Sequence, residues 1–188
     1  MYNDIKQALQ VLRNGGVILY PTDTIWGLGC DATNKEAVKK IYEIKKRTDN
    51  KSMIVLMDSV NRLSSYINDI PDVVFDMLEY SESPLTVILE GAKFLAENVI
   101  NKSDNSVGVR IVNESFCNKL IQQFKKPIVS TSANISGEPS PFIFDEISDE
   151  IINSVDYVVT YRQDDLTKAK PSSIIKIGKD SSVKIIRK

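Results

Sequence analysis

The sequence predicts an α/β protein: a single domain, residues 1–188, with a twisted mixed sheet and flanking helices. Segments with helical periodicity alternate with short apolar runs typical of buried strands, which is the pattern of a sheet covered by helices. Several expected strands follow one another without an intervening helix, so the sheet should be mixed rather than purely parallel. The length of 188 residues, with 42% hydrophobic and 26% charged residues, is typical of one globular domain.

The first third of the chain should contain two helices and two strands. They are expected at about 3–13 (helix), 17–20 (strand), 35–45 (helix) and 53–57 (strand). The first helix carries apolar residues at helical spacing and ends at Gly15 and Gly16. Pro21 stops the first strand, because proline has no N–H group to donate. Asn34 can cap the second helix, since its side chain accepts hydrogen bonds from the first helical N–H groups.

The rest of the chain repeats the alternation. Helices are expected at about 71–80, 114–124 and 145–152, and strands at 85–89, 107–111, 127–129, 157–160, 174–177 and 183–186. Pro71 suits the first position of its helix, where its missing N–H has no intrahelical partner anyway. Helix 114–124 places Cys117, Leu120 and Ile121 on one apolar face.

The composition excludes several classes of site and protein. The chain has no histidine, so Ser-His-Asp and Cys-His mechanisms are impossible. Two cysteines, Cys30 and Cys117, cannot supply the four ligands of a structural zinc site, whereas Mg²⁺ held by oxygens stays open. The apolar runs are far shorter than a membrane span and residues 1–6 do not resemble a secretory signal, so we expect a cytoplasmic protein without a membrane contact.

The charge is unevenly distributed although the formal net charge is only −1. Residues 35–51 hold seven basic and three acidic residues, and residues 162–188 hold eight basic and three acidic residues. Such segments suit an anionic ligand, such as a nucleotide or the phosphates of RNA. The alternative interpretation is that they are solvated helix faces and a basic tail.

A polar segment follows the first expected strand, at the place where open α/β sheets commonly bind ligands. Thr22 and Thr24 would point the same way on an extended backbone and could bind a small zwitterion. The alternative is a turn started by Pro21, with Trp26 in the core. The segment Gly27-x-Gly29-x-x-Ala32 also matches a dinucleotide fingerprint, but residues 21–26 separate it from the strand and no helix follows at once, so we reject that reading.

Three further segments carry polar or charged side chains next to expected strands. Lys45 and Arg47 share a side only if their helix has ended, and they would then offer two cations to one anion; otherwise they form a solvated helix end. Ser132 and Asn134 follow the strand at 127–129 and suit a hydrogen-bonding loop, whereas the alternative is an ordinary surface loop. Arg110 interrupts an apolar strand and needs an anionic partner if it is buried.

Together these segments resemble the YrdC-like family, the threonylcarbamoyl-AMP synthases, over about residues 5–178. The matching motifs are Pro21-Thr22-Asp23-Thr24-Ile25-Trp26-Gly27-Leu28, Lys45-Lys46-Arg47, Pro84-Leu85-Thr86-Val87, Val107-Gly108-Val109-Arg110, Ser132-Ala133-Asn134 and Pro171-Ser172-Ser173-Ile174. Their order and separations agree with the family pattern.

The resemblance implies an activity and a site. It implies synthesis of threonylcarbamoyl-adenylate and pyrophosphate from L-threonine, bicarbonate and ATP with Mg²⁺, and transfer of the product to partner proteins that modify tRNA. By matching position, the nucleotide would be bound by Lys45, Arg47, Ser132 and Asn134, with Lys45 and Arg47 as the catalytic cations. Threonine would be bound by Thr22, Thr24, Arg110, Ser172 and Ser173. A concave, positively charged face in this family also implies a contact with tRNA or double-stranded RNA.

The chain departs from the family pattern at Thr48, Ser52 and residues 80–83, and we expect these changes to affect substrate affinity more than reaction type. The general base is open, with Asp23, solvent and bicarbonate as candidates. Two other functions also remain open. One is a non-catalytic RNA-binding protein of the same fold, suggested by the two basic segments. The other is a carbamoyl transferase related to hydrogenase maturation enzymes, which contain a similar domain.

Overall fold

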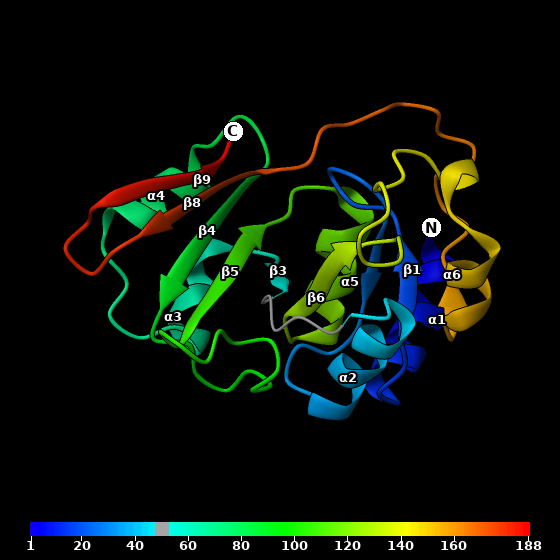
Figure 1. The fold of residues 1–188 in the computed structure, drawn as a ribbon, viewed down its shortest axis with the longest axis horizontal. Coiled ribbons are helices and arrows are strands. Elements are labelled where there is room, and N and C mark those ends of the chain that lie inside the picture. The colour runs from blue at the N-terminus through cyan, green and yellow to red at the C-terminus, as the bar shows by residue number, and fades with distance from the viewer. Residues whose placement is uncertain (48–52) are drawn as a thin grey trace.

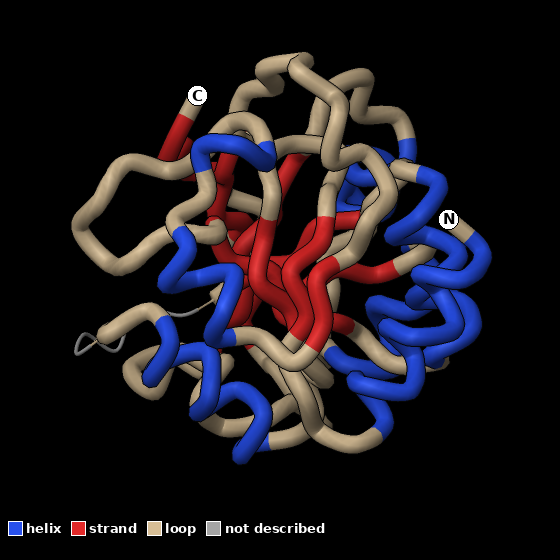
Figure 2. Tube along the Cα trace, turned by 90° about the vertical axis from the view of Figure 1, so that its right-hand side faces the viewer, coloured by secondary structure: helices blue, strands red, loops and turns tan. Residues whose placement is uncertain are grey.

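A computed structural model describes residues 1–47 and 53–188 and forms a nine-stranded sheet with helices on both faces (Figures 1 and 2). The helices are α1 (Tyr2–Arg13), α2 (Lys35–Ile44), α3 (Leu63–Tyr66), α4 (Val73–Glu79), α5 (Ser115–Phe124) and α6 (Asp149–Ser154). The strands are β1 (Ile18–Tyr20), β2 (Gly27–Gly29), β3 (Ile54–Met57), β4 (Leu85–Glu90), β5 (Ser106–Ile111), β6 (Ile128–Ser132), β7 (Tyr157–Val158), β8 (Ser173–Ile177) and β9 (Val183–Arg187).

The sheet is mixed, as the sequence predicted. Its strand order is β7-β1-β2-β6-β3-β5-β4-β8-β9. The pairs β1 with β7, β3 with β5 and β4 with β8 are parallel, and the other neighbours are antiparallel.

In the described part of the chain, none of the helices has both the length and the apolar character that a membrane span needs.

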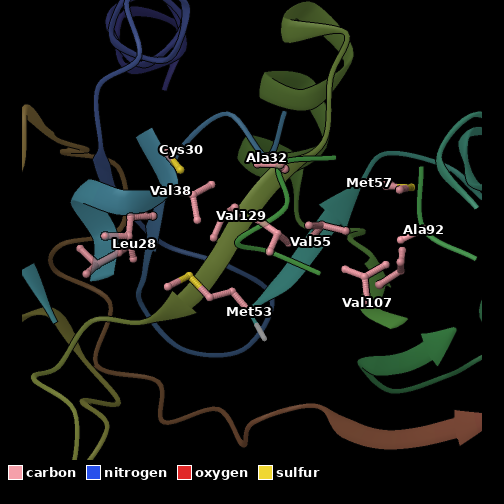
Figure 3. Packing of buried hydrophobic residues seen from close by; sticks show 14 of the residues in the cluster. Leu28, Cys30, Ala32, Val38, Met53, Val55, Met57, Ala92, Val107 and Val129 are labelled. Atoms are coloured by element: carbon pink, nitrogen blue, oxygen red, sulfur yellow. The ribbon is translucent and has the colours of Figure 1, made fainter. Parts of the chain in front are cut away.

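Two apolar clusters cover the two faces of the sheet. Strand β1 shows the division, because Ile18 and Tyr20 contribute to one cluster while Leu19 contributes to the other. Helices α1 and α5 pack on the Ile18 side, and α2, α3, α4 and α6 contribute to the larger cluster on the Leu19 side. Figure 3 shows part of that larger cluster, where Val55 of β3 and Val129 of β6 lie near Val38 of α2.

The structure differs from the expected elements at three places. Strand β2 was not expected, because glycine is depleted in strands; it forms here between β1 and β6. A short helical segment, η1 (Val60–Arg62) followed by α3, was also not expected. The helix expected at 145–152 is divided into a 3-10 turn, η2 (Phe144–Glu146), and α6, because Ile147 and Ser148 have extended backbone angles.

Close packing around position 29 of β2 leaves no room for a side chain. A Cβ atom on Gly29 would lie 2.6 Å from Cε1 of Tyr20 and 3.0 Å from the carbonyl oxygen of Val129. Gly29 therefore lies within a strand rather than at the start of a helix, which agrees with the rejection of the dinucleotide fingerprint.

The substitution Gly29→Ala should lower the free energy of unfolding by about 1–3 kcal/mol, because the added methyl group overpacks the contact between β1, β2 and β6. Urea denaturation measures this change. Lys119→Ala on the exposed side of α5 is the control and should stay within about 0.5 kcal/mol of the wild type. Equal stability of the two variants would contradict the packing argument.

Candidate active site

A cavity of about 210 Å³ lies against the sheet where segments from distant parts of the sequence meet. Its walls come from the loop before β2, the end of β6, the start of β3, strands β5, β8 and β9, and the segment after α2. Among the expected site residues, those that line this cavity are Thr24, Arg47, Arg110, Ser132 and Ser172. Both halves of the sheet therefore contribute to one site.

The two threonines of the first motif have different roles. Thr22 Oγ1 donates a hydrogen bond to the carbonyl oxygen of Ile25 (2.8 Å) and accepts one from the backbone N–H of Thr24 (3.0 Å). Because the Thr22 hydroxyl hydrogen is used in this way, the 2.9 Å contact between the two hydroxyls must be donated by Thr24 Oγ1. The lone pairs of Thr24 can then accept a donor from the cavity, such as an ammonium group. Thr22 lies behind Thr24 and holds it in place.

Arg110 is a buried cation on β5, and it has the acidic partner that the sequence required. Its guanidinium lies 3.0 Å from Oδ1 of Asp23, in the loop that also carries Thr24. Burial raises the pKa of the Asp23 carboxyl, while Arg110 opposes that rise. Nε of Arg110 is buried and has no hydrogen-bond partner among the described residues. Arg110 also lines the cavity, so its guanidinium can bind a carboxylate placed there.

Lys45 follows the end of α2 and connects that helix to the loop after β6. Helix α2 ends at Ile44, as a shared site for Lys45 and Arg47 requires. The buried ammonium of Lys45 donates to the carbonyl oxygens of Ser132 and Asn134, both at 2.6 Å. Burial lowers the pKa of Lys45 to about 8, and the nearby charge of Arg47 adds to this effect. An anion beside Lys45 would reverse the shift.

Asn134 lies in the same loop and is held by its side-chain amide. Nδ2 donates to the carbonyl oxygens of Ile135 (2.9 Å) and Glu138 (2.8 Å). Its Oδ1 atom is buried and has no hydrogen-bond partner among the described residues, and Asn134 does not line the cavity. Lys45 and Asn134 therefore lie behind Ser132 and Arg47, which reach the cavity surface.

Ser172 and Ser173 lie at the start of β8 and face different spaces. Ser172 lines the cavity, and its hydroxyl lies 2.8 Å from Oγ1 of Thr86 on β4. Ser173 lines an adjacent cavity instead. Its backbone N–H donates to the carbonyl oxygen of Pro84, which pairs β8 with β4.

Sequence reasoning missed Arg187, the last residue of β9, which also lines the cavity. Its Nε and Nη2 atoms donate to the carbonyl oxygen of Ser172 at 3.0 and 2.8 Å. A hairpin of β8 and β9 places Arg187 opposite Ile174, directly beside Ser172. Reading residues 173–187 as a hairpin would have predicted this position.

The acidic residues of the described chain do not form a metal site of their own. No group of three or more Asp, Glu or Cys residues able to hold a metal ion occurs within residues 1–47 and 53–188. The departures at Thr48 and Ser52 lie outside the described residues. In the departure at 80–83, Tyr80 follows α4 and Ser81 donates to the carbonyl oxygen of Ser83 at 2.7 Å.

Comparison with known proteins identifies the class of this chain. The Sua5/YciO/YrdC family model, described as "Telomere recombination", matches residues 10–188. A putative threonylcarbamoyl-AMP synthase of Methanocaldococcus jannaschii is 34% identical over 189 residues, which cover 96% of this chain and 85% of that protein. The chain therefore belongs to the Sua5/YciO/YrdC family, and the resemblance found in the sequence is confirmed.

Two solved structures share the fold. E. coli YciO superimposes with a TM-score of 0.86 at 25% identity, covering 100% of this chain and 90% of that one. P. abyssi Sua5 complexed with L-threonine superimposes with a TM-score of 0.81 at 26% identity and covers 92% of this chain. This chain covers 50% of that longer Sua5 chain.

The different roles of the two threonines can be tested by isosteric replacement. Thr22→Val should lower the free energy of unfolding by about 2 kcal/mol, because it leaves the Ile25 carbonyl and the Thr24 N–H without their partner. Thr24→Val removes one hydroxyl contact and should cost less than half as much. Guanidinium denaturation of both variants measures the difference, and a larger loss for Thr24→Val would contradict the assignment.

Proposed function

We propose that this chain is a threonylcarbamoyl-AMP synthase that joins L-threonine, bicarbonate and ATP, with release of pyrophosphate. The observation that carries the proposal is the shared cavity. It brings Thr24, Arg110 and Ser172, which suit an amino acid, together with Arg47 and Ser132, which suit a nucleotide. The name of the M. jannaschii relative and the threonine complex of P. abyssi Sua5 support it. We place the reaction in the cytoplasm.

The proposed reaction needs positioning and charge rather than a covalent nucleophile. Threonine first loses a proton from its ammonium group, and the free amine then condenses with bicarbonate to form a carbamate and one molecule of water. A carbamate oxygen then attacks the α-phosphorus of ATP and pyrophosphate leaves. Such phosphoryl chemistry depends mainly on alignment and on stabilising the developing negative charge. Lys45 and Arg47 supply that positive charge next to Ser132, and the absence of histidine is no obstacle.

The proposal assigns threonine to one end of the cavity and ATP to the other. In the proposal, Thr24 accepts a hydrogen bond from the threonine ammonium group and Arg110 binds its carboxylate. Mg²⁺ arrives on the phosphates of ATP as part of the substrate, since Mg²⁺ commonly binds through substrate phosphates and water. The product passes to downstream proteins that modify tRNA. The proton acceptor is bicarbonate or solvent, because Asp23 is paired with Arg110 and faces the neighbouring cavity.

A non-catalytic RNA-binding function is less well supported by the charges. Several lysines of the basic segments have acidic partners in the fold. They include Lys35 with Glu97, Lys46 with Glu150, Lys168 with Glu146, Lys176 with Asp104 and Lys179 with Asp69. These pairs reduce the positive potential that an RNA backbone would encounter, because each cation shares its field with a neighbouring carboxylate. The synthase therefore remains the better proposal.

Replacing Lys45 or Arg47 with alanine should reduce product formation at least a hundredfold while the protein stays folded, because each variant removes a cation from the nucleotide end. Pyrophosphate release is measured with ATP, Mg²⁺, threonine and bicarbonate, each omitted in turn, with mass detection of the adenylate. Lys39→Ala on the exposed side of α2 is the control and should retain full activity. Unchanged activity in both site variants would contradict the proposal.

Nucleotide affinity should depend on the protonation of Lys45. Burial lowers the pKa of Lys45 to about 8 in the free protein, and bound phosphates should raise this pKa again. Affinity for a non-hydrolysable ATP analogue should thus be constant below pH 7 and fall above pH 8, by at most about tenfold per pH unit. Calorimetric titration from pH 6.5 to 9.5 measures the profile. Lys45→Met should flatten it, and a wild-type profile that is equally flat would exclude Lys45 as the titrating group.

A further inference from the structure

Arg162 connects the segment between β7 and β8 to the loop that carries Thr24. Its Nη1 atom donates to the backbone carbonyl oxygen of Thr22 at 3.1 Å, although the two residues are 140 positions apart. Its Nε atom donates to Oδ2 of Asp165 at 2.9 Å. The side chain is partly buried, with 28% of its surface exposed. Hydrogen bonds from a charged donor are roughly twice as strong as those between neutral groups, so this contact is suited to holding a loop in place.

The backbone that carries Arg162 is itself held by two helices. The N–H and the hydroxyl group of Thr160 donate to Oδ1 of the buried Asp4 in α1, at 2.7 and 2.8 Å. The ring of Tyr161 stacks on that of Phe116 in α5. Arg162 therefore extends from a fixed base, and Figure 1 shows the segment that begins there, in orange, crossing toward β8.

The backbone conformation of Arg162 suits glycine better than arginine. Its φ angle is +66°, in the left-handed region, where the Cβ atom of an L-residue crowds the neighbouring carbonyl group. Glycine adopts this conformation without that steric cost. The strained residue is thus the one whose side chain bridges two distant segments, and such strain is common where a side chain has a functional task.

The loop after β1 is held at two successive carbonyl groups. Sγ of Cys117 donates to the carbonyl oxygen of Pro21 at 3.1 Å, and a thiol is a weak donor. Arg162 holds the next carbonyl group, that of Thr22, with a charged donor. Thr22 Oγ1 in turn lies 3.0 Å from the N–H of Thr24 and 2.9 Å from its hydroxyl oxygen. A shift of the Thr22 backbone would therefore move the Thr24 hydroxyl at the cavity surface.

The charges around Arg162 keep it oriented at neutral pH. Hydrogen bonds from Thr167, together with the one from Arg162, lower the pKa of Asp165 to about 2, so this carboxylate is ionised. The charge of Arg162 also reaches Asp23 in the loop after β1. Burial raises the pKa of Asp23, and Arg110 and, to a smaller degree, Arg162 oppose the rise.

We propose that Arg162 is a positioning residue for threonine, because it fixes the Thr22 carbonyl group and thereby keeps the Thr24 hydroxyl in place to accept the ammonium group. This inference rests on the proposed function, which assigns threonine to Thr24. Arg162 is not among the described residues that line the cavity, so it acts through the loop and not by contact with a substrate. The nucleotide end, which Lys45 joins to the loop after β6, does not depend on this contact.

The test compares two variants that both lose the guanidinium but differ in backbone strain. Arg162→Ala keeps the strain at φ +66°, whereas Arg162→Gly relieves it and should therefore melt at the higher temperature of the two. Both variants should raise the KM for threonine, and the Kd from calorimetric titration with L-threonine, about tenfold, because the charged hydrogen bond to the loop is lost. The KM for ATP should stay within twofold of the wild type.

Two further variants complete the comparison. Arg162→Lys keeps the charge but not the planar fork that reaches Thr22 and Asp165 together, so it should restore threonine affinity only in part. The control Lys168→Ala removes another cation of the same segment, which is paired with Glu146, and should leave both KM values unchanged.

The outcomes separate a positioning role from a structural one. A threonine KM equal to that of the wild type in both variants would overturn the inference. A rise in Arg162→Ala that disappears in Arg162→Gly would also overturn it, since backbone strain would then be the cause, and so would an equal rise in the KM for ATP. Failure of the wild type to form the adenylate would contradict the proposed reaction instead, and titration with L-threonine would still compare the variants. A wild type that binds no L-threonine would overturn both proposals.

Discussion

The buried ammonium of Lys45 is held by two backbone carbonyl groups, those of Ser132 and Asn134, and not by an acidic side chain. Carbonyl oxygens solvate the cation without cancelling its charge, so the positive potential remains available to a ligand. The same contacts join the end of α2 to the loop after β6, and the backbone N–H of Ser136 donates to the carbonyl oxygen of Lys45 at 2.9 Å. Lys45 thus holds the loop after β6 in place at the proposed nucleotide end and, together with Arg47, supplies the positive charge there.

At the opposite end of the cavity, the positive charge is partly neutralised by an acidic side chain. Arg110 is paired with Asp23, so part of its positive charge is balanced within the protein. Arg187 adds a second guanidinium, which is held by the carbonyl oxygen of Ser172. Such an arrangement suits one carboxylate, whereas the less neutralised Lys45 suits a polyphosphate. In the proposed function, this difference would place threonine at the Arg110 end and ATP at the Lys45 end.

The sequence was sufficient to predict the fold class, because helical and strand periodicities are local properties of the chain. Strand β2 was not predictable in this way, since its Gly-Leu-Gly sequence forms a strand only between β1 and β6. Nine candidate site residues were named from the motifs, and five of them line the cavity. The sequence did not show which five these would be. Thr22 and Thr24 look equivalent in the sequence, and their roles separate only through the direction of one hydrogen bond. Arg187 was missed because its position depends on the pairing of β8 with β9.

Because the site has no histidine, proton transfer must depend on how hydroxyl groups, cations and substrates are positioned. The Thr22 hydroxyl has its hydrogen committed to Ile25, which leaves Thr24 as an acceptor toward the cavity and thus favours an ammonium ligand there. That ligand must lose a proton before it can react with bicarbonate. An acceptor that enters with the substrates avoids the need for a resident base, and Asp23 is unsuited to that role while it balances Arg110. In the proposed reaction, the fold therefore contributes alignment and fixed cations, and bicarbonate or water would accept the proton.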